Sequence, residues 1–371
     1  MWRLLSRLFN NNNLLLTHSG KQWKKSFSSS TERKLNVAVI GGGRIGQVHM
    51  ETLSFHTPLA KPVMIVDFIE KVAKSTAEKF GVAKYSTDFK DVLKDPSIEA
   101  VWICSPSSQH SEQIKALAAA GKHIFCEKPL AITLKEAEEV TLAVEKAKVK
   151  MMLAFQRRFD PNFAKAKQCI QAGAVGDVYA VHLISRDPAP PPIEYIQNSG
   201  GIHNDMAIHD FDIARFMTGS ECEEIVAYGA CRVDPKIASE GNDIDTAITL
   251  LKFKNGAFCT IDNCRQSPSG YDQRVEVFGS KGLVRFGNNF PNNVFIEDGH
   301  SIRRSDLPFN FFMDRYTEAY RNETKEFVKC VLENKEPPTS GRDGTAAMAM
   351  AIAAKKSFLE KRPVKLSEIN P

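Results

Sequence analysis

The feature that most constrains the fold of this chain is a short apolar run that ends in a glycine-rich loop. Residues 35–40 read LNVAVI, residues 41–46 read GGGRIG, and a helix is expected to follow. A buried parallel strand, a GxGxxG loop and a helix form a binding element for the pyrophosphate of a dinucleotide. The first glycine permits the tight turn, the third lets the backbone approach the phosphates, and the last lets the helix pack on the strand. The residues predicted to contact the cofactor in this loop are Gly41, Gly43, Arg44, Ile45 and Gly46.

Strand-like and helical segments alternate over residues 34–155. Apolar runs at 63–66, 98–104, 123–126 and 150–154 predict further strands, and helices are expected at 71–80, 88–94, 111–120 and 133–147. Such alternation is typical of a doubly wound α/β sheet. We therefore predict an N-terminal Rossmann dinucleotide-binding domain at 34–155.

The pattern changes in the second half of the chain. Strand-like runs are closely spaced there and are separated by turns such as Asn255-Gly256. The expected strands are 178–185, 224–233, 246–253, 257–263 and 274–279, and the expected helices are 160–172, 203–217, 315–333 and 344–360. These features predict a C-terminal α+β domain at 156–371, with an open, mainly antiparallel sheet.

The charge is distributed unevenly along the chain. The formal net charge of +5 arises in the first thirty residues, which hold five basic residues and no acid. The remaining chain carries 44 basic and 44 acidic residues, so its charge gives no reason to expect a nucleic-acid partner. No stretch approaches the roughly 18 apolar residues of a membrane helix, and we predict no membrane partner.

The basic, serine-rich leader suggests a targeting segment. We predict that residues 1–31 are a mitochondrial transit peptide and that the protein resides in the matrix, the alternative being an uncleaved cytoplasmic tail. The asparagine run at 10–13 interrupts the apolar stretch and disfavours a secretory signal. Eight cysteines are scattered without a CxxC pair, which indicates free thiols in a reducing compartment.

Asp67 ends the second predicted strand. A carboxylate at this position accepts hydrogen bonds from the adenosine ribose and repels a 2′-phosphate, so we predict NAD rather than NADP as cofactor. The alternative is a surface turn residue.

Polar side chains follow three further strands, at the edge where ligands bind in such sheets. Lys128 lies just beyond a buried strand and precedes a proline, so its ammonium group could stabilise a developing alkoxide, unless it merely caps the strand in solvent. Ser105, His110 and Glu127 are predicted to lie along the cofactor. For His110 the alternative is a structural role at the start of a helix, and Glu127 is expected to position its neighbours.

Residues 200–212 read GGIHNDMAIHDFD and are predicted to open a helix. On a continuous helix, Asp205, His209 and Asp212 would share one face. A histidine that is oriented by nearby carboxylates suits general base catalysis, so His209 is the candidate base for removing a hydroxyl proton. Asp205 is expected to orient this histidine or a neighbouring hydroxyl. An exposed helix with ion pairs is the alternative. No cysteine or second histidine stands at metal-ligand spacing, and we predict no metal.

These motifs together resemble the glucose–fructose oxidoreductase/inositol dehydrogenase (Gfo/Idh/MocA) family. The resemblance spans about residues 34–365 and includes GGGRIG, Glu127-Lys128-Pro129, and Asp205 with His209. The stretches SRDPAPPP at 185–192, IHDFD at 208–212 and YDQRVEVFG at 271–279 are similar to the inositol dehydrogenase members. The basic leader departs from bacterial members of the family.

The resemblance implies a set of roles. Lys128, Asp205 and His209 match the family's catalytic positions, and Arg157, Asp187 and Tyr271 match positions that contact polyol hydroxyls. The sequence does not distinguish Arg157 from its neighbour Arg158 as the inward-pointing arginine. It implies NAD-dependent oxidation of a polyol ring hydroxyl, most simply myo-inositol to its 2-keto product, with His209 as base and Lys128 assisting. Alternatives are another sugar or dihydrodiol dehydrogenase of the family, or a non-catalytic dinucleotide-binding regulator. The resemblance also implies that the domain at 156–371 binds the substrate and that the open face of its sheet forms a homodimer or homotetramer.

Overall fold

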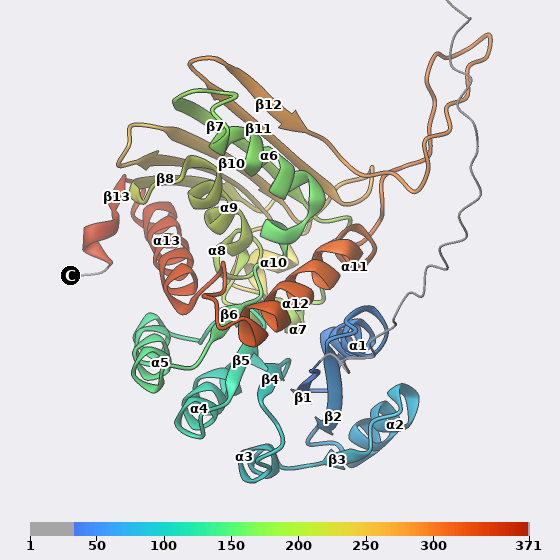
Figure 1. Cartoon of the computed structure of the whole chain (residues 1–371). Coiled ribbons are helices and arrows are strands. Elements are labelled where there is room, and N and C mark those ends of the chain that lie inside the picture. The colour runs from blue at the N-terminus through green and yellow to red at the C-terminus, as the bar shows by residue number, and fades with distance from the viewer. Residues whose placement is uncertain (1–32, 370–371) are drawn as a thin grey trace, which may run out of the picture. The chain divides into compact units, whose positions relative to one another are not determined.

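The computed structural model describes residues 33–369, in which two β-sheets are each packed against helices (Figure 1). The first sheet is parallel throughout and has the order β3-β2-β1-β4-β5-β6. Its strands are β1 (Leu35–Ile40), β2 (Ala60–Val66), β3 (Lys84–Ser86), β4 (Ala100–Ile103), β5 (His123–Cys126) and β6 (Met151–Leu153). The predicted doubly wound sheet is confirmed, with β3 as an additional short edge strand.

The helices of this part connect the parallel strands. They are α1 (Arg44–Glu51), α2 (Glu70–Phe80), α3 (Lys90–Lys94), α4 (Ser107–Ala119) and α5 (Leu134–Ala147), with a π-helical turn at Thr52–His56. The strand order reverses between the neighbours β1 and β4, which places a ligand crevice at their carboxyl ends.

The second sheet is mixed, with the order β12-β11-β7-β10-β9-β8-β13. All neighbours are antiparallel except β7 and β10, so the predicted mainly antiparallel sheet is confirmed. The strands are β7 (Val178–Arg186), β8 (Cys222–Ala230), β9 (Thr246–Phe253), β10 (Phe258–Cys264), β11 (Asp272–Gly279), β12 (Gly282–Phe286) and β13 (Val364–Lys365).

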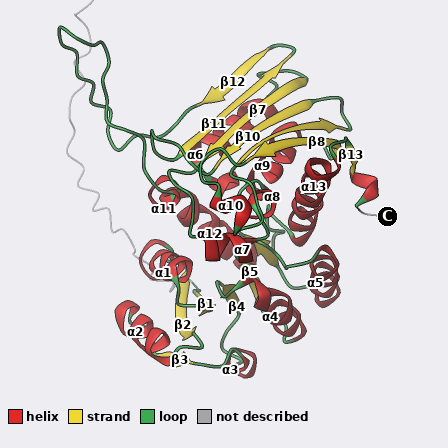
Figure 2. Cartoon of the chain, turned by 180° about the vertical axis from the view of Figure 1, so that it is seen from behind, coloured by secondary structure: helices red, strands yellow, loops and turns green. Residues whose placement is uncertain are grey.

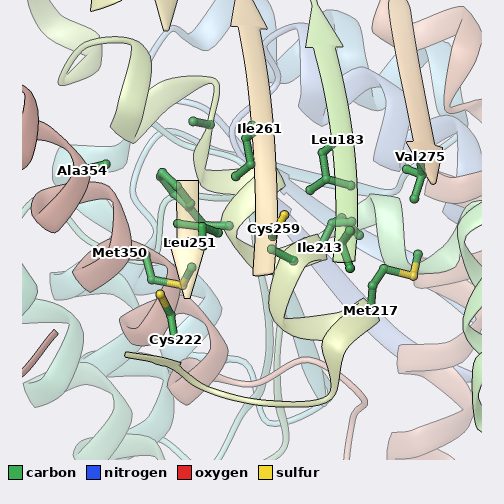
Figure 3. Packing of buried hydrophobic residues seen from close by; sticks show 14 of the residues in the cluster. Leu183, Ile213, Met217, Cys222, Leu251, Cys259, Ile261, Val275, Met350 and Ala354 are labelled. Carbon is green, nitrogen blue, oxygen red and sulfur yellow. The ribbon is translucent and has the colours of Figure 1, made fainter. Parts of the chain in front are cut away.

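Helices cover one face of the second sheet. Figures 1 and 2 show α6 (Pro161–Gln171), α9 (Ile208–Thr218) and α13 (Gly341–Glu360) on this face. Figure 3 shows strand side chains such as Leu183 and Ile261 clustered with helix side chains such as Ile213 and Met350. Buried and exposed residues alternate along β9, which is the pattern of a sheet with one covered face.

The remaining elements are short helices, turns and a longer helix that precedes α13. They are a 3₁₀ turn at Gln156–Phe159, α7 (Ile193–Ser199), α8 (Ile202–Asp205), α10 (Lys236–Ser239), α11 (Phe312–Arg315), α12 (Thr317–Leu332) and a 3₁₀ turn at Leu366–Glu368. α12 packs back on the first sheet, where Phe327 and Val328 join the apolar cluster of Trp102 and Phe125. Within residues 33–369, no helix has the length and apolar character needed to cross a membrane.

The prediction of one continuous helix at 203–217 is wrong. The chain forms α8 and α9 instead, separated by Met206 and Ala207. The Asp205 carbonyl accepts a hydrogen bond from the Lys128 Nζ at 3.0 Å, in place of the backbone N–H that a continuous helix would supply. A tertiary contact from a distant loop therefore ends α8, and the i, i+4, i+7 face assumed for Asp205, His209 and Asp212 does not exist.

Candidate active site

The glycine loop leaves space for a ligand at one of its three motif glycines. Gly41 has φ +100°, and a Cβ there would lie 2.4 Å from the Cys104 carbonyl oxygen. A Cβ on Gly46 would lie 1.9 Å from the Gly41 oxygen, so this glycine is needed for helix–strand packing. A Cβ on Gly43 would meet nothing within 4 Å. Gly43 therefore exposes its backbone at the start of α1, as the approach of a pyrophosphate requires.

Asp67 is fixed at the carboxyl end of β2 by two backbone donors. Its Oδ2 accepts from the Gly42 N–H at 2.7 Å and its Oδ1 accepts from the Ile69 N–H at 2.9 Å. The side chain lines a cavity of about 490 Å³ next to the glycine loop. Asp88 also lines this cavity, and its described lining includes no lysine or arginine. Two carboxylates without a cation suit ribose hydroxyls better than a 2′-phosphate.

Ser105 and His110 occupy different environments. Ser105 lines the cavity and donates to the Gln113 side chain at 2.6 Å. The His110 ring is buried, with Nδ1 2.7 Å from the Pro129 carbonyl and Nε2 3.0 Å from the Ser105 carbonyl. Because both ring nitrogens already have protein partners, the structure favours the structural alternative for His110 over a direct cofactor contact.

Lys128 and Asp205 are brought together from distant parts of the chain. The Lys128 Nζ donates to the Asp205 carbonyl at 3.0 Å and to its carboxylate Oδ1 at 3.4 Å. Both side chains are partly enclosed, with relative exposures of 22% and 13%. The solvated strand cap considered for Lys128 is therefore wrong, because its ammonium group is paired inside the protein.

Two further residues complete the surroundings of Asp205. The Tyr195 hydroxyl donates to Oδ1 at 2.8 Å, and the buried Arg265 lies 3.4 Å from Oδ2. Burial alone would raise the pKa of Asp205, but Lys128 and Arg265 together with the hydrogen bond from Tyr195 hold this pKa below its ordinary value. Asp205 is therefore ionised and forms an ion pair with Lys128. Neither Tyr195 nor Arg265 stands in a motif, so sequence reasoning missed both.

His209 is a buried, neutral imidazole. Burial, followed by the positive charges of Lys128 and Arg157, lowers its pKa well below 6.5. Its ring stands edge-on to Phe155 at 6.1 Å. Nδ1 is fully enclosed and has no hydrogen-bond partner, whereas Nε2 is not fully enclosed. A neutral ring with an accessible Nε2 can take a proton.

No carboxylate orients the His209 ring in the described structure, contrary to the expectation for Asp205 and Asp212. Asp205 is occupied as described above, and Asp212 accepts from Arg158 Nε at 2.8 Å. Arg158 also bonds Asp343 at 2.9 Å. Asp212 and Arg158 thus belong to a structural ion-pair network beneath α9. Among residues 33–369, neither Asp205 nor His209 belongs to a group of side chains close enough together to hold a metal ion.

Arg157 lies beneath the candidate base and is almost fully engaged. Its guanidinium donates to Asp210 at 2.5 Å and to the Ser185 hydroxyl at 3.1 Å, and it lies 5.9 Å from the centre of the Tyr316 ring. Asp210 in turn accepts from Asn263 at 2.8 Å. Only the Arg157 Nε lacks a partner, so this arginine chiefly holds α9 and its histidine in place.

Asp187 and Tyr271 have polar atoms left for a ligand. Neither side chain has a hydrogen-bond partner among the described residues, and the polar end of neither is fully enclosed. Burial raises the pKa of Asp187 to about 6, with Arg265, Asp205, Arg157 and Lys128 as its charged neighbours. Tyr271 packs edge-on against Tyr316 at 5.9 Å. Lys128 follows β5 at the carboxyl edge of the first sheet, and its positive charge acts on both His209 and Asp187.

The chain matches two family profiles in succession. The profile described as "Oxidoreductase family, NAD-binding Rossmann fold" matches residues 35–155, and that described as "Oxidoreductase family, C-terminal alpha/beta domain" matches residues 167–366. The protein is therefore an NAD-dependent oxidoreductase. It belongs to the Gfo/Idh/MocA family, which confirms the resemblance found in the sequence.

Several relatives carry a more specific description. A myo-inositol 2-dehydrogenase of Thermotoga maritima is 44% identical over 335 residues, covering 90% of this chain and 99% of the relative. A crystal structure of a myo-inositol dehydrogenase from Corynebacterium glutamicum has a TM-score of 0.86 at 34% identity, covering 90% of this chain and 99% of that chain. The scyllo-inositol dehydrogenase of Lactobacillus casei, solved with NAD(H) and scyllo-inositol, has a TM-score of 0.84 at 27% identity, covering 90% and 100%.

Proposed function

We propose that this protein oxidises one ring hydroxyl of an inositol with NAD, and that its principal substrate is myo-inositol, converted at C2 to the 2-keto product. The observation that supports the proposal is the pair that Asp205 forms with Lys128, which follows β5, together with a neutral His209 on which the charge of Lys128 acts. The 44% identity to the Thermotoga maritima enzyme extends over almost the full length of that relative and supports the choice of substrate.

The proposed chemistry assigns one task to each group. His209 takes the hydroxyl proton at Nε2, which its lowered pKa keeps free at neutral pH. Lys128 donates a hydrogen bond to the same oxygen and stabilises the alkoxide that develops there. Asp205 orients Lys128 through its carbonyl and carboxylate. The bound nicotinamide supplies the hydride acceptor.

The remaining hydroxyls of the ring need partners that define its orientation. Asp187 and Tyr271 offer a carboxyl and a phenol with unused hydrogen-bonding capacity, whereas the Arg157 Nε, although unpaired, is fully enclosed. A site that hydrogen-bonds several hydroxyls rejects a sugar that lacks one of them, because the buried polar group is then left unpaired. We therefore expect cyclitols to be preferred over aldoses.

A substrate panel tests the proposal. Formation of reduced nicotinamide is followed by its absorbance with myo-inositol, scyllo-inositol, an aldose and a dihydrodiol, each with NAD and with NADP. The expected result is the highest kcat/KM with myo-inositol and NAD. A higher value with scyllo-inositol, the ligand in the Lactobacillus casei structure, would change the assigned stereochemistry only. No turnover of any polyol would overturn the proposal in favour of a non-catalytic role.

We also propose a mitochondrial location. Residues 1–31 lie outside the described residues, and the support for a transit peptide is their composition, with five basic residues and no acid in the first thirty. A fluorescent fusion to the full chain should localise to the mitochondrial matrix, and a fusion that begins at residue 32 should remain in the cytoplasm. Cytoplasmic fluorescence for both fusions would favour the uncleaved-tail alternative.

A homodimer or homotetramer is proposed from the uncovered face of the second sheet, within the domain at 156–371. Large apolar side chains are exposed along its strands, including Tyr228 at 69% and Ile248 at 49%, which are paired across β8 and β9. An apolar patch of this kind usually marks an interface. The substitution Leu250→Glu on this face should lower the mass measured by light scattering, whereas Leu142→Glu on α5 should leave it unchanged. An unchanged mass in both variants would contradict the proposal.

A further inference from the structure

Three titratable side chains meet in the interior next to the Lys128 loop. They are His49 of α1, Glu127 directly after β5, and Glu323 of α12. One ring nitrogen of His49 and one oxygen from each carboxyl group lie within 4.8 Å of one another. The cluster joins the phosphate-binding helix, the residue that precedes Lys128, and a helix from the end of the chain. None of its members has a role in the chemistry proposed above.

His49 and Glu127 already form a direct pair. The His49 Nε2 lies 2.7 Å from Glu127 Oε1, and the histidine has no solvent exposure. Its ring is held edge-on between Phe125 at 5.1 Å and Tyr320 at 5.8 Å. One oxygen of Glu127 is therefore paired with a histidine whose ring is restrained by its neighbours.

Glu323 is the unusual member of the cluster. It is completely buried, and neither carboxyl oxygen has a hydrogen-bond partner. An ionised carboxylate can only accept hydrogen bonds, so in this position it would be a buried charge without a donor, which is strongly unfavourable. A protonated carboxyl group carries no charge and has one O–H to donate.

None of the described side chains that face Glu323 is a lysine or an arginine. They are His49 and Glu127 across the cluster, Tyr320 one turn earlier on α12, and Cys104 at the end of β4. Within residues 33–369 no lysine or arginine forms an ion pair with it. Burial, followed by the negative charge of Glu127, raises the pKa of Glu323 well above 4.5.

We propose that Glu323 is a neutral carboxylic acid that directs its proton toward Glu127, and that it acts with His49 as a positioning residue for the Lys128 loop. Glu127 is then held on one side by the hydrogen bond with His49 and faces, on the other, the Glu323 carboxyl group, one oxygen of which lies within 4.8 Å. Because Glu127 and Lys128 are adjacent in the chain, a fixed Glu127 backbone fixes the origin of the lysine side chain.

The pH dependence of stability tests the protonation state. A glutamate that stays protonated only in the folded state destabilises the folded protein as pH rises above the ordinary glutamate pKa. The ratio of folded to unfolded protein then falls by up to about tenfold per pH unit. Denaturant unfolding of the wild type and of Glu323→Gln, which keeps the shape without a titrating proton, is measured from pH 6 to pH 9. The variant should gain stability relative to the wild type as pH rises. A constant difference across this range would overturn the proposal.

A control variant and an infrared measurement accompany the unfolding experiment. Glu318 lies on the same helix but is exposed and paired with Arg321, so Glu318→Gln should follow the wild type at every pH. If Glu323→Gln does not fold, the infrared spectrum of the wild type still decides. At neutral pH, protein with ¹³C-labelled glutamate should show a shifted carboxylic-acid C=O stretch, and the absence of that band would overturn the proposal.

A divalent cation could neutralise the two carboxyl groups in place of a proton. Metal analysis of the purified full-length protein separates these cases. The expected result is no stoichiometric metal and no change in unfolding when EDTA is added. One bound metal per chain that is lost in Glu323→Gln would overturn the proposal.

The positioning role has its own readout, which rests on the proposed function. Glu323→Gln should keep kcat for inositol oxidation within about threefold of the wild type, whereas Glu323→Asp, which withdraws the carboxyl group, should lower kcat more than tenfold with a smaller change in the KM for NAD. Equal losses in both variants would contradict the role. Since the stability and infrared measurements need no substrate, failure of inositol oxidation and failure of the protonation proposal are distinguishable.

Discussion

The two ends of the candidate active site are built in different ways. At the cofactor end, the proposed contacts come from the backbone of one short segment with Gly41, Gly43 and Gly46, and from Asp67, which two backbone N–H groups fix. At the substrate end, side chains converge from distant elements and their charges lie close together. A substitution at the cofactor end should act mainly by steric overlap. A substitution at the substrate end should act by changing a charge, and it should affect several neighbouring side chains.

The largest effect is expected at the substrate end. Lys128→Met removes the group proposed to stabilise the alkoxide and should lower kcat by about 10²- to 10³-fold. NAD affinity should change little, because the glycine loop and Asp67 are untouched. Steady-state kinetics and NAD titration measure the two effects separately. Lys115→Met, which removes an exposed lysine paired with Glu139, is the control. Turnover like that of the wild type would remove Lys128 from the mechanism.

A pair of glycine substitutions tests the steric character of the cofactor end. Gly46→Ala places a Cβ 1.9 Å from the Gly41 oxygen and should destabilise the protein by about 1–3 kcal/mol. Gly43→Ala meets no atom within 4 Å, so stability without NAD should stay within about 0.5 kcal/mol while NAD binding weakens. Thermal unfolding with and without NAD distinguishes the two. Equal destabilisation by both alanines would refute this assignment.

The charge of Asp67 should matter less than its position. Asp67→Asn keeps an acceptor for a backbone N–H but removes the charge that repels a 2′-phosphate. We expect the preference for NAD over NADP to fall by roughly tenfold, equivalent to about 1.4 kcal/mol. The ratio of kcat/KM for the two cofactors measures it. An unchanged ratio would mean that the shape of the cavity, rather than this carboxylate, selects the cofactor.

The smallest effect concerns the pH dependence of the proposed base. A base must be unprotonated, and the lowered pKa of His209 should place the acid limb of kcat/KM below pH 6.5. Asp187, with a pKa of about 6, titrates in the same region, so Asp187→Asn should be compared with the wild type. A limb that stays below pH 6.5 in both supports His209. A limb above pH 6.5 would indicate a different base.

The sequence predicts the cofactor end well because the information there is local. The bounds of β1 and β5 were predicted to the residue, and the steric roles of the motif glycines follow from a contiguous pattern. The substrate end depends on contacts between distant residues. Lys128 lies 77 positions from Asp205, whose carbonyl it binds, and this contact breaks the helix that periodicity predicts. Tyr195, Arg265 and Glu323 carry no motif, and their importance follows only from their burial and partners.

The return of α12 to the first sheet has a consequence for the order in which the chain becomes stable during synthesis. Phe327 and Val328 fill the apolar layer beside Trp102 and Phe125, so that layer stays incomplete until almost the whole polypeptide has left the ribosome. A nascent chain that ends near residue 155 would present this apolar surface to chaperones. The nucleotide-binding half is therefore the first to be made, yet it depends on the last part of the chain to reach its mature packing.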